Sequence, residues 1–159
     1  MKYPIITYLL ILFLGFQTVC GQSKENISIG SAFKIYSNIL NEERTCFISL
    51  PDSYKEHSEF KDYPVLILLD GYTYFKTTVG IVHFMSSSRN RNNIIPEMII
   101  VAIENVNRER DFTVTKLKTK RANSMGGGRN FLSFIEKELI PFVDKTYSTE
   151  ANRILVGHS

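Results

Sequence analysis

Residues 153–159 read Arg-Ile-Leu-Val-Gly-His-Ser, and the rest of the chain is understood most readily from this stretch. Three branched apolar residues in a row are typical of a short strand buried on both faces, as in the middle of a parallel sheet. The glycine and the polar residues after it end the run. We therefore expect residues 153–156 to form a central strand, with Ser159 just beyond its carboxyl end.

The tripeptide after this strand matches the first half of a G-x-S-x-G nucleophile elbow. In that motif a strand turns sharply into a helix and presents a serine hydroxyl at the end of the sheet. Gly157 would leave room for the tight turn, because it has no β-carbon to clash there. A Gly-His-Ser sequence also occurs in an ordinary loop after a strand. The other segments of the chain therefore have to decide between these two interpretations.

The composition is that of an ordinary globular protein with at most one domain. Its 159 residues are 43% hydrophobic and 22% charged, with a net charge of +3. A charge this small and scattered does not argue for binding of nucleic acid. We interpret Arg89, Arg91 and Arg108 as parts of a solvated loop face. The sequence has no metal-ligand spacing and no phosphate-binding glycine motif, so we expect no metal and no cofactor.

Residues 1–21 differ from the rest and are interpreted as a secretory signal peptide. The apolar run at residues 5–16 is too short to cross a hydrocarbon layer of roughly 30 Å. Val19 and Gly21 supply the small residues of a cleavage site. A lipoprotein signal with Cys20 lipidated is the alternative, although the residues before it fit that signal poorly. We expect secretion or periplasmic export without a stable membrane anchor.

From residue 22 onward, apolar patterns predict the order strand, strand, strand, helix, strand, helix, strand. Strands alternating with helices predict crossover connections and a mostly parallel sheet, that is, an α/β fold. The long polar segment 104–129 is interpreted as a functional loop. Pro141 is expected to kink or split the second helix. The predicted strands are residues 28–38, 42–51, 64–69, 98–103 and 153–156, and the predicted helices are residues 75–85 and 130–147.

Three polar segments follow strands of this predicted sheet. They are Asp70-Gly71, residues 105–111 and Ser159. In open parallel sheets, reactive groups lie beyond the carboxyl ends of the strands. The topology therefore predicts that these segments converge on one edge of the sheet.

In this order, the segments resemble the putative-esterase family of the α/β-hydrolase superfamily, which includes enterochelin-type esterases, esterase D and mycolyltransferases. The resemblance implies an α/β-hydrolase fold, with residues 22–159 as the N-terminal portion of a single domain. It also implies a serine-dependent carboxylic ester hydrolase that forms an acyl-enzyme. The substrate would be a small-molecule ester, such as a siderophore lactone, an acylated sugar or a thioester. The matching stretches are residues 40–51, 63–71, 103–113, 131–147 and 157–159.

The resemblance also assigns roles to individual residues. Ser159 would be the nucleophile, and the backbone N–H of Tyr72, next to Gly71, would be one oxyanion-hole donor. Such donors stabilise the charge of the tetrahedral intermediate without having to reorient. Gly71, Arg110 and Asp111 are candidate substrate-binding residues. The alternative for the last two is an ion pair that braces the loop. Val114 stands where the family usually has proline, and this replacement of proline by valine is expected to loosen the loop.

In these folds the triad acid and base follow the nucleophile in the chain. The sequence thus resembles an N-terminal fragment that ends at the nucleophile, and we expect it to be inactive alone, because serine is a weak nucleophile without a base. None of His57, His83 and His158 is expected to be the base; His83 is interpreted as a core residue. Cys46 is interpreted as a buried thiol. A non-catalytic binding module and an acyltransferase remain alternatives, and the oligomeric state is open.

Overall fold

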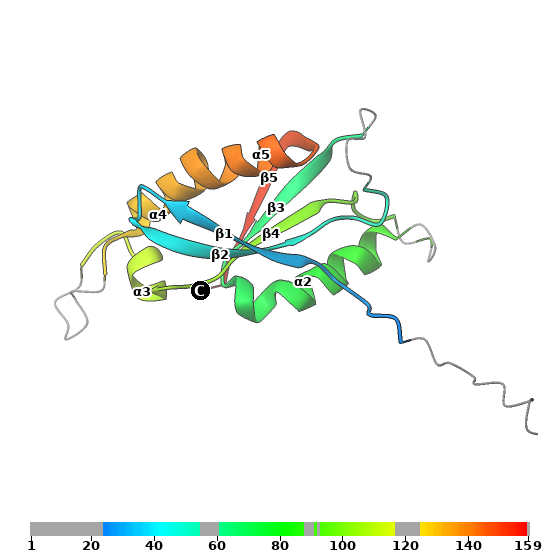
Figure 1. The fold of residues 1–159 in the computed structure, drawn as a ribbon, viewed down its shortest axis with the longest axis horizontal. Helices are drawn as coiled ribbons and strands as arrows, with labels where there is room; N and C mark the ends of the chain where they lie inside the picture. Colours follow the sequence, from blue (N-terminus) through cyan, green and yellow to red (C-terminus); the bar gives the residue numbers. More distant parts are fainter. Residues whose placement is uncertain (1–23, 55–60, 88–90, 92, 117–124, 159) are drawn as a thin grey trace, which may run out of the picture.

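A computed structural model describes residues 24–54, 61–87, 91, 93–116 and 125–158. Its centre is a five-stranded sheet with the strand order β1-β2-β4-β3-β5 (Figure 1). The predicted strands are confirmed, with shifted ends. They are β1 (Ser31–Ser37), β2 (Glu42–Ser49), β3 (Tyr63–Leu68), β4 (Ile99–Ile103) and β5 (Thr149–Val156).

The sheet is parallel where it carries the candidate site. β3 pairs in parallel with β4 on one side and with β5 on the other. β2 pairs antiparallel with β4, and β1 pairs antiparallel with β2. The turn between β1 and β2 contains Asn41 at φ 52°, a left-handed conformation that asparagine tolerates better than most residues. The first two strands therefore form a hairpin at the edge opposite β5.

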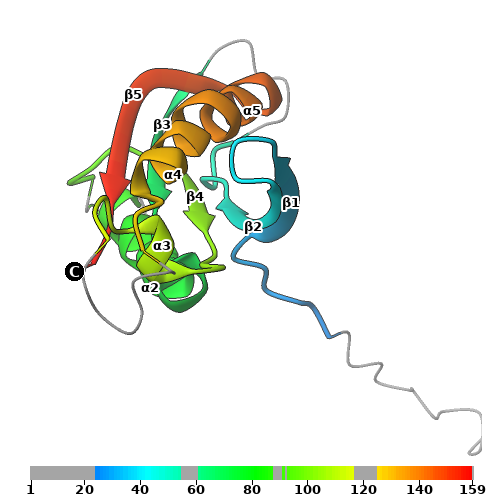
Figure 2. The same cartoon turned by 90° about the vertical axis from the view of Figure 1, so that its left-hand side faces the viewer.

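Helices cover both faces of this sheet (Figures 1 and 2). α2 (Gly71–Ser86) lies on one face, and α4 (Gly128–Phe134), η3 (Ile135–Leu139) and α5 (Ile140–Thr146) lie on the other. The short helix α3 (Arg108–Asp111) follows β4. The predicted split at Pro141 takes another form: the backbone stays helical from residue 128 to 146, and the π-helical segment η3 interrupts the α-helical pattern just before the proline. Among the described residues, no helix has the length and apolar character that crossing a membrane requires.

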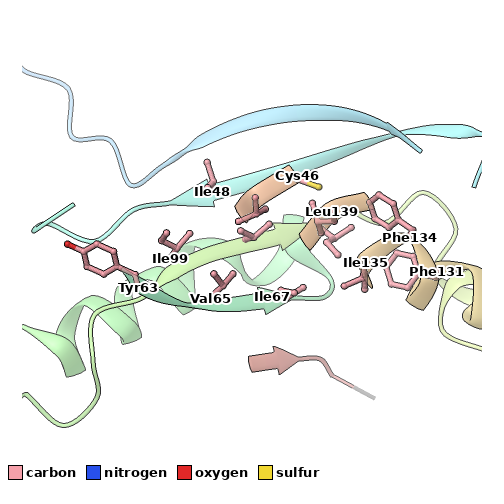
Figure 3. Packing of buried hydrophobic residues seen from close by; sticks show 13 residues of the cluster. Cys46, Ile48, Tyr63, Val65, Ile67, Ile99, Phe131, Phe134, Ile135 and Leu139 are labelled. Carbon is pink, nitrogen blue, oxygen red and sulfur yellow. The ribbon is translucent and has the colours of Figure 1, made fainter. Parts of the chain in front are cut away.

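Two cores form because successive strand residues point to opposite faces of the sheet. Val65, Ile67 and Ile99 pack against α4, η3 and α5, where Phe134 and Leu139 are fully buried (Figure 3). Leu66, Leu68, Ile100 and Ala102 pack against Phe75, Val79 and Val82 of α2 on the other face. Full burial of such a side chain contributes about 1.5–3 kcal/mol. Apolar residues at every position of β3 and β4 therefore hold helices on both faces.

The structure corrects several predicted element ends. α2 begins at Gly71 rather than at residue 75, because the chain turns directly from β3 into the helix. β5 begins at Thr149 rather than at residue 153, since its polar first half also pairs with β3. α4 begins at Gly128 rather than at residue 130.

β5 also differs from the central strand that was expected. It pairs only with β3 within the described residues, and it forms the edge of the sheet (Figure 2). Ile154 and Leu155 are 42% and 52% exposed. The apolar run correctly indicated a strand, but burial on both faces was wrong for the described part of the chain, because β5 pairs there only with β3 and its apolar side chains stay partly exposed.

Candidate active site

The carboxyl ends of β3, β4 and β5 meet at one edge of the sheet, as the sequence predicted. Asp70 follows β3, Asn105 and Arg108 follow β4, and His158 follows β5. The Leu69 N–H donates to the Val156 carbonyl at 2.8 Å, which extends the pairing of β3 and β5 to this edge. The rings of Tyr74 and His158 lie 5.9 Å apart. Ser159 lies outside the described residues.

Asp70 is the centre of the polar contacts at this edge. Its carboxylate accepts hydrogen bonds from the Asn105 amide and from Arg108 Nε at 2.8 Å. Burial alone would raise its pKa, but the hydrogen bonds from Arg108 and Asn105 outweigh burial and hold the pKa below its ordinary value. Asp70 is therefore an anion at neutral pH, tied to two residues that follow the neighbouring strand.

The start of α2 leaves backbone donors open at the same edge, and the Tyr72 N–H is one of them. Asp70 occupies the N-cap position, but its side chain makes no capping bond. Its carbonyl accepts from the N–H groups of Thr73 and Tyr74 at 3.0 and 3.2 Å. The Tyr72 N–H has no acceptor among the described residues, as expected for a helix's first turn without a side-chain cap. A fixed, unoccupied donor is what an oxyanion hole requires, and the role of Tyr72 stays a prediction.

Gly71 brings α2 unusually close to β4. A β-carbon at this position would lie 2.8 Å from both the nitrogen and the oxygen of Ile103. Only glycine fits at such a distance, so Gly71 sets how closely the helix start approaches the end of β4. Its predicted contact with substrate is not tested by these backbone contacts.

Arg110 and Asp111 take part in an ion-pair network below the edge. Arg110 donates to both carboxylate oxygens of Glu42, at 2.9 and 2.5 Å, and to Asp111 at 2.8 Å. The hydrogen bonds that Arg110 donates to Glu42 and then to Asp111 raise the pKa of Arg110. Asp111 also accepts from the fully buried Arg44 at 2.7 Å. These are the contacts of a loop brace, and substrate binding by either residue stays a prediction.

Arg108 was interpreted as part of a solvated loop face, and the structure corrects this. Its guanidinium binds Asp70, donates to the His158 carbonyl and lies 4.8 Å from the centre of the Phe112 ring. Asp70 and Asn105 were likewise named only as parts of segments. The sequence signal that could have identified them is an acid directly after one strand, together with an amide and an arginine after the neighbouring strand.

Two other candidates for chemistry are excluded by their surroundings. Cys46 is fully buried, and burial raises its pKa to about 12, so it is a neutral thiol at physiological pH. Ser53 lies 3.0 Å from the Lys61 ammonium, but a hydrogen bond to Glu97 raises the pKa of that lysine. Lys61 is therefore a cation and cannot act as a base for Ser53.

One of the histidine predictions was wrong, and that none of the three is the base stays a prediction; His57 lies outside the described residues. His83 is 59% exposed and lies 3.7 Å from Asp52, so its interpretation as a core residue was wrong. The helical stripe that suggested burial is narrower than expected, because only Phe75, Val79 and Val82 of that stripe reach the sheet. A groove of about 770 Å³ lies beside His83 and Asp52 at the other end of the sheet, and no candidate catalytic residue lines it.

Comparisons with known proteins find relatives that match most of this chain. A family model described as Putative esterase matches residues 37–159. Ferri-bacillibactin esterase BesA of Bacillus subtilis (strain 168) is 29% identical over 136 residues, which cover 75% of this chain and 46% of BesA. An IroE-like serine hydrolase from Shewanella oneidensis matches with a TM-score of 0.75 and 34% identity, over 81% of this chain and 42% of that one.

The BES protein from Bacillus cereus gives a TM-score of 0.71 at 29% identity, over 89% of this chain and 55% of that protein. The matches confirm the predicted α/β-hydrolase fold. The chain spans only about half the length of these relatives, between 42% and 55% of each. Residues that complete a catalytic site in such proteins can therefore lie in parts that have no counterpart in these 159 residues.

Proposed function

Because the chain belongs to the putative-esterase family of the α/β-hydrolases, we propose that the whole protein is a serine-dependent carboxylic ester hydrolase with Ser159 as its nucleophile. The observation that carries this proposal is the open Tyr72 N–H at the edge where His158 follows β5. Ser159 is joined covalently to His158, and the strand-to-helix turn of a nucleophile elbow belongs at this edge.

In the proposed reaction, Ser159 Oγ forms a bond to the ester carbonyl carbon while a base takes the hydroxyl proton. The negative charge moves to the carbonyl oxygen, where the Tyr72 N–H stabilises it. Loss of one such donor typically costs about 3 kcal/mol of barrier. The carbon–oxygen bond to the alcohol then breaks as the base returns its proton to the alkoxide. Water repeats the sequence and releases the acid.

The base and its acidic partner are expected among residues that follow Ser159 in the whole protein. A polypeptide that ends at Ser159 is therefore expected to show negligible turnover. The proposed nucleophile is thus part of the sequence, whereas the base that would activate it is expected after residue 159.

Aromatic side chains lie exposed near this edge, since Tyr72 and Tyr74 are 76% and 37% exposed. BesA is named as an esterase of ferri-bacillibactin, which supports a small-molecule ester of the siderophore type as substrate. Residues 1–21 are proposed to be a cleaved signal peptide, which would place the enzyme in the periplasm or outside the cell.

The test uses the full-length protein and p-nitrophenyl butyrate. We expect turnover in the wild type, none above background in Ser159→Ala, and covalent labelling of Ser159 by a fluorophosphonate probe. Turnover that survives Ser159→Ala would refute the assignment of the nucleophile. A wild type that neither turns over nor labels would favour the non-catalytic alternative. Product analysis with added sugar alcohols distinguishes hydrolysis from acyl transfer.

A further inference from the structure

We propose that Arg108 is a positioning residue that keeps the Asp70 carboxylate from occupying the Tyr72 N–H, and that it ties this open donor to the end of β5. The inference rests on the proposed function only for its catalytic consequence. The structural part concerns three contacts of Arg108 and the conformation of Asp70.

The guanidinium of Arg108 joins the ends of two strands. Its Nε donates to Asp70 Oδ1 at 2.8 Å, and its Nη2 donates to Asp70 Oδ2 at 3.2 Å. Nη2 also donates to the carbonyl oxygen of His158 at 2.7 Å. That carbonyl belongs to the peptide that leads to Ser159. One planar group thus bridges the loop after β3 and the loop after β5.

Asp70 has a second conformation available to it. An aspartate at the N-cap ordinarily has an extended backbone, and its carboxylate accepts from the second or third N–H of the helix. The second residue of α2 is Tyr72. Asp70 instead has φ 55° and ψ 41°, in the left-handed region, and makes no capping bond. Aspartate enters this region at some cost in free energy, so the surroundings must hold it there.

Arg108 and Asn105 are the groups that hold it. Both donate to the Asp70 carboxylate, whose side chain is only 7% exposed. Without Arg108, the carboxylate would lose two charge-assisted bonds, and the extended capping conformation would become competitive. A capping carboxylate would then occupy the Tyr72 N–H and place a negative charge where the oxyanion has to form. Arg108 therefore acts on the reaction through Asp70.

The kinetic test compares four forms of the full-length protein on p-nitrophenyl butyrate: wild type, Arg108→Ala, Arg108→Lys and the double variant Arg108→Ala/Asp70→Gly. We expect Arg108→Ala to lower kcat by about 100-fold, as loss of an oxyanion donor does, with KM changed only a few-fold. Arg108→Lys should lie between, because one ammonium cannot bridge both partners as a planar fork does.

The double variant carries the decisive prediction. Glycine adopts the left-handed conformation freely and has no carboxylate, so kcat should recover at least tenfold relative to Arg108→Ala. A purely structural role for Arg108 predicts no such recovery. Wild-type kcat in Arg108→Ala, or a double variant no faster than the single one, would overturn the proposal. Lys34→Ala, at a surface ion pair with Glu43 far along the sheet, is the matched control.

Amide hydrogen exchange at Tyr72, measured by NMR without substrate, tests the inference independently of activity. Exchange should be slower in Arg108→Ala than in the wild type, because the carboxylate then protects the amide, and fast again in the double variant. Unchanged exchange in Arg108→Ala would overturn the inference even if the protein is an esterase. If the wild type proves inactive, the exchange result still decides the structural claim. Arg108→Lys serves for this measurement should Arg108→Ala fail to fold.

Discussion

At the scale of single residues, the structure holds charged side chains in arrangements that such side chains rarely adopt. Asp70 stands at a helix start yet leaves the helix uncapped, and Arg108 binds both a carboxylate and a backbone carbonyl. Arg44 is fully buried, and two of its nitrogens have no hydrogen-bond partner among the described residues. Its guanidinium lies 5.3 Å from the centre of the Phe131 ring, which offers a cation–π contact instead. Such arrangements persist only where neighbouring contacts enforce them.

The Asp70 carboxylate should make the free energy of unfolding depend on pH in the acidic range. Its folded pKa is held low by Arg108 and Asn105 against the effect of burial, whereas an unfolded aspartate has a pKa of about 3.9. The stabilisation is therefore complete above about pH 4 and is lost as the pH falls through the lower folded pKa. At pH 7, Asp70→Asn should lower the free energy of unfolding by about 1.5–3 kcal/mol.

Urea denaturation at several pH values between about 7 and 2 measures this effect. The difference in stability between the wild type and Asp70→Asn should shrink as the pH falls below about 4. Asp62→Asn, at an exposed position, should leave the stability nearly unchanged throughout. A difference that stays constant down to the lowest pH would show that the charge of Asp70 is not what stabilises this edge.

At the scale of elements, the packing of α2 against the sheet determines the position of the Tyr72 N–H. The helix starts after a loop of only two residues that follows β3, and Gly71 lets it come close to the backbone of Ile103 at the end of β4. Phe75, Val79 and Val82 then bury one face of the helix against the sheet. The donor of Tyr72 is thus placed by packing along the whole helix.

Two glycines of α2 offer a matched pair of substitutions that tests how closely the helix packs against β4. Gly71→Ala should lower the free energy of unfolding by about 1–3 kcal/mol, because its β-carbon would overlap the β4 backbone. Gly80→Ala has open space around the new β-carbon and should raise stability by about 0.5–1 kcal/mol, since alanine favours a helix interior. Denaturant unfolding measures both. Equal effects of the two substitutions would mean that α2 is not held closely against β4.

At the scale of the whole molecule, the described sheet has two edge strands, β1 and β5. The hairpin of β1 and β2 ends the sheet on one side, and β5 ends it on the other (Figure 2). The side chains of Ile154, Leu155 and Val156 in β5 are partly exposed. An apolar strand with unpaired backbone groups is a template for association. β5 is therefore the strand at which we expect association.

A polypeptide of residues 22–159 is expected to self-associate at micromolar concentrations through β5. Leu155→Lys should reduce this association, because a charge at the edge opposes strand pairing. Leu132→Lys, at a similarly exposed position on α4, should not. Sedimentation velocity compares the three forms. Equal association in the wild type and Leu155→Lys would show that the open edge is not the cause.

Much of the fold and part of the site could be predicted from the sequence. The apolar runs identified all five strands, and the order of strands and helices indicated that the loops after β3, β4 and β5 share one edge. Periodicity and chain order are local properties, so the sequence states them directly. The same segments carried the resemblance to the esterase family, which the family match confirms.

Only the tertiary structure decided which side chains meet and which surfaces stay open. Arg108 reaches Asp70 across 38 residues of sequence and His158 across 50, and the backbone of Asp70 is left-handed beside these contacts. The exposure of β5 likewise depends on the strands and helices that do or do not lie beside it. The physical reason is the same in each case: side-chain pairing and burial depend on neighbours that are distant in the chain, whereas strand and helix formation depend mainly on adjacent residues.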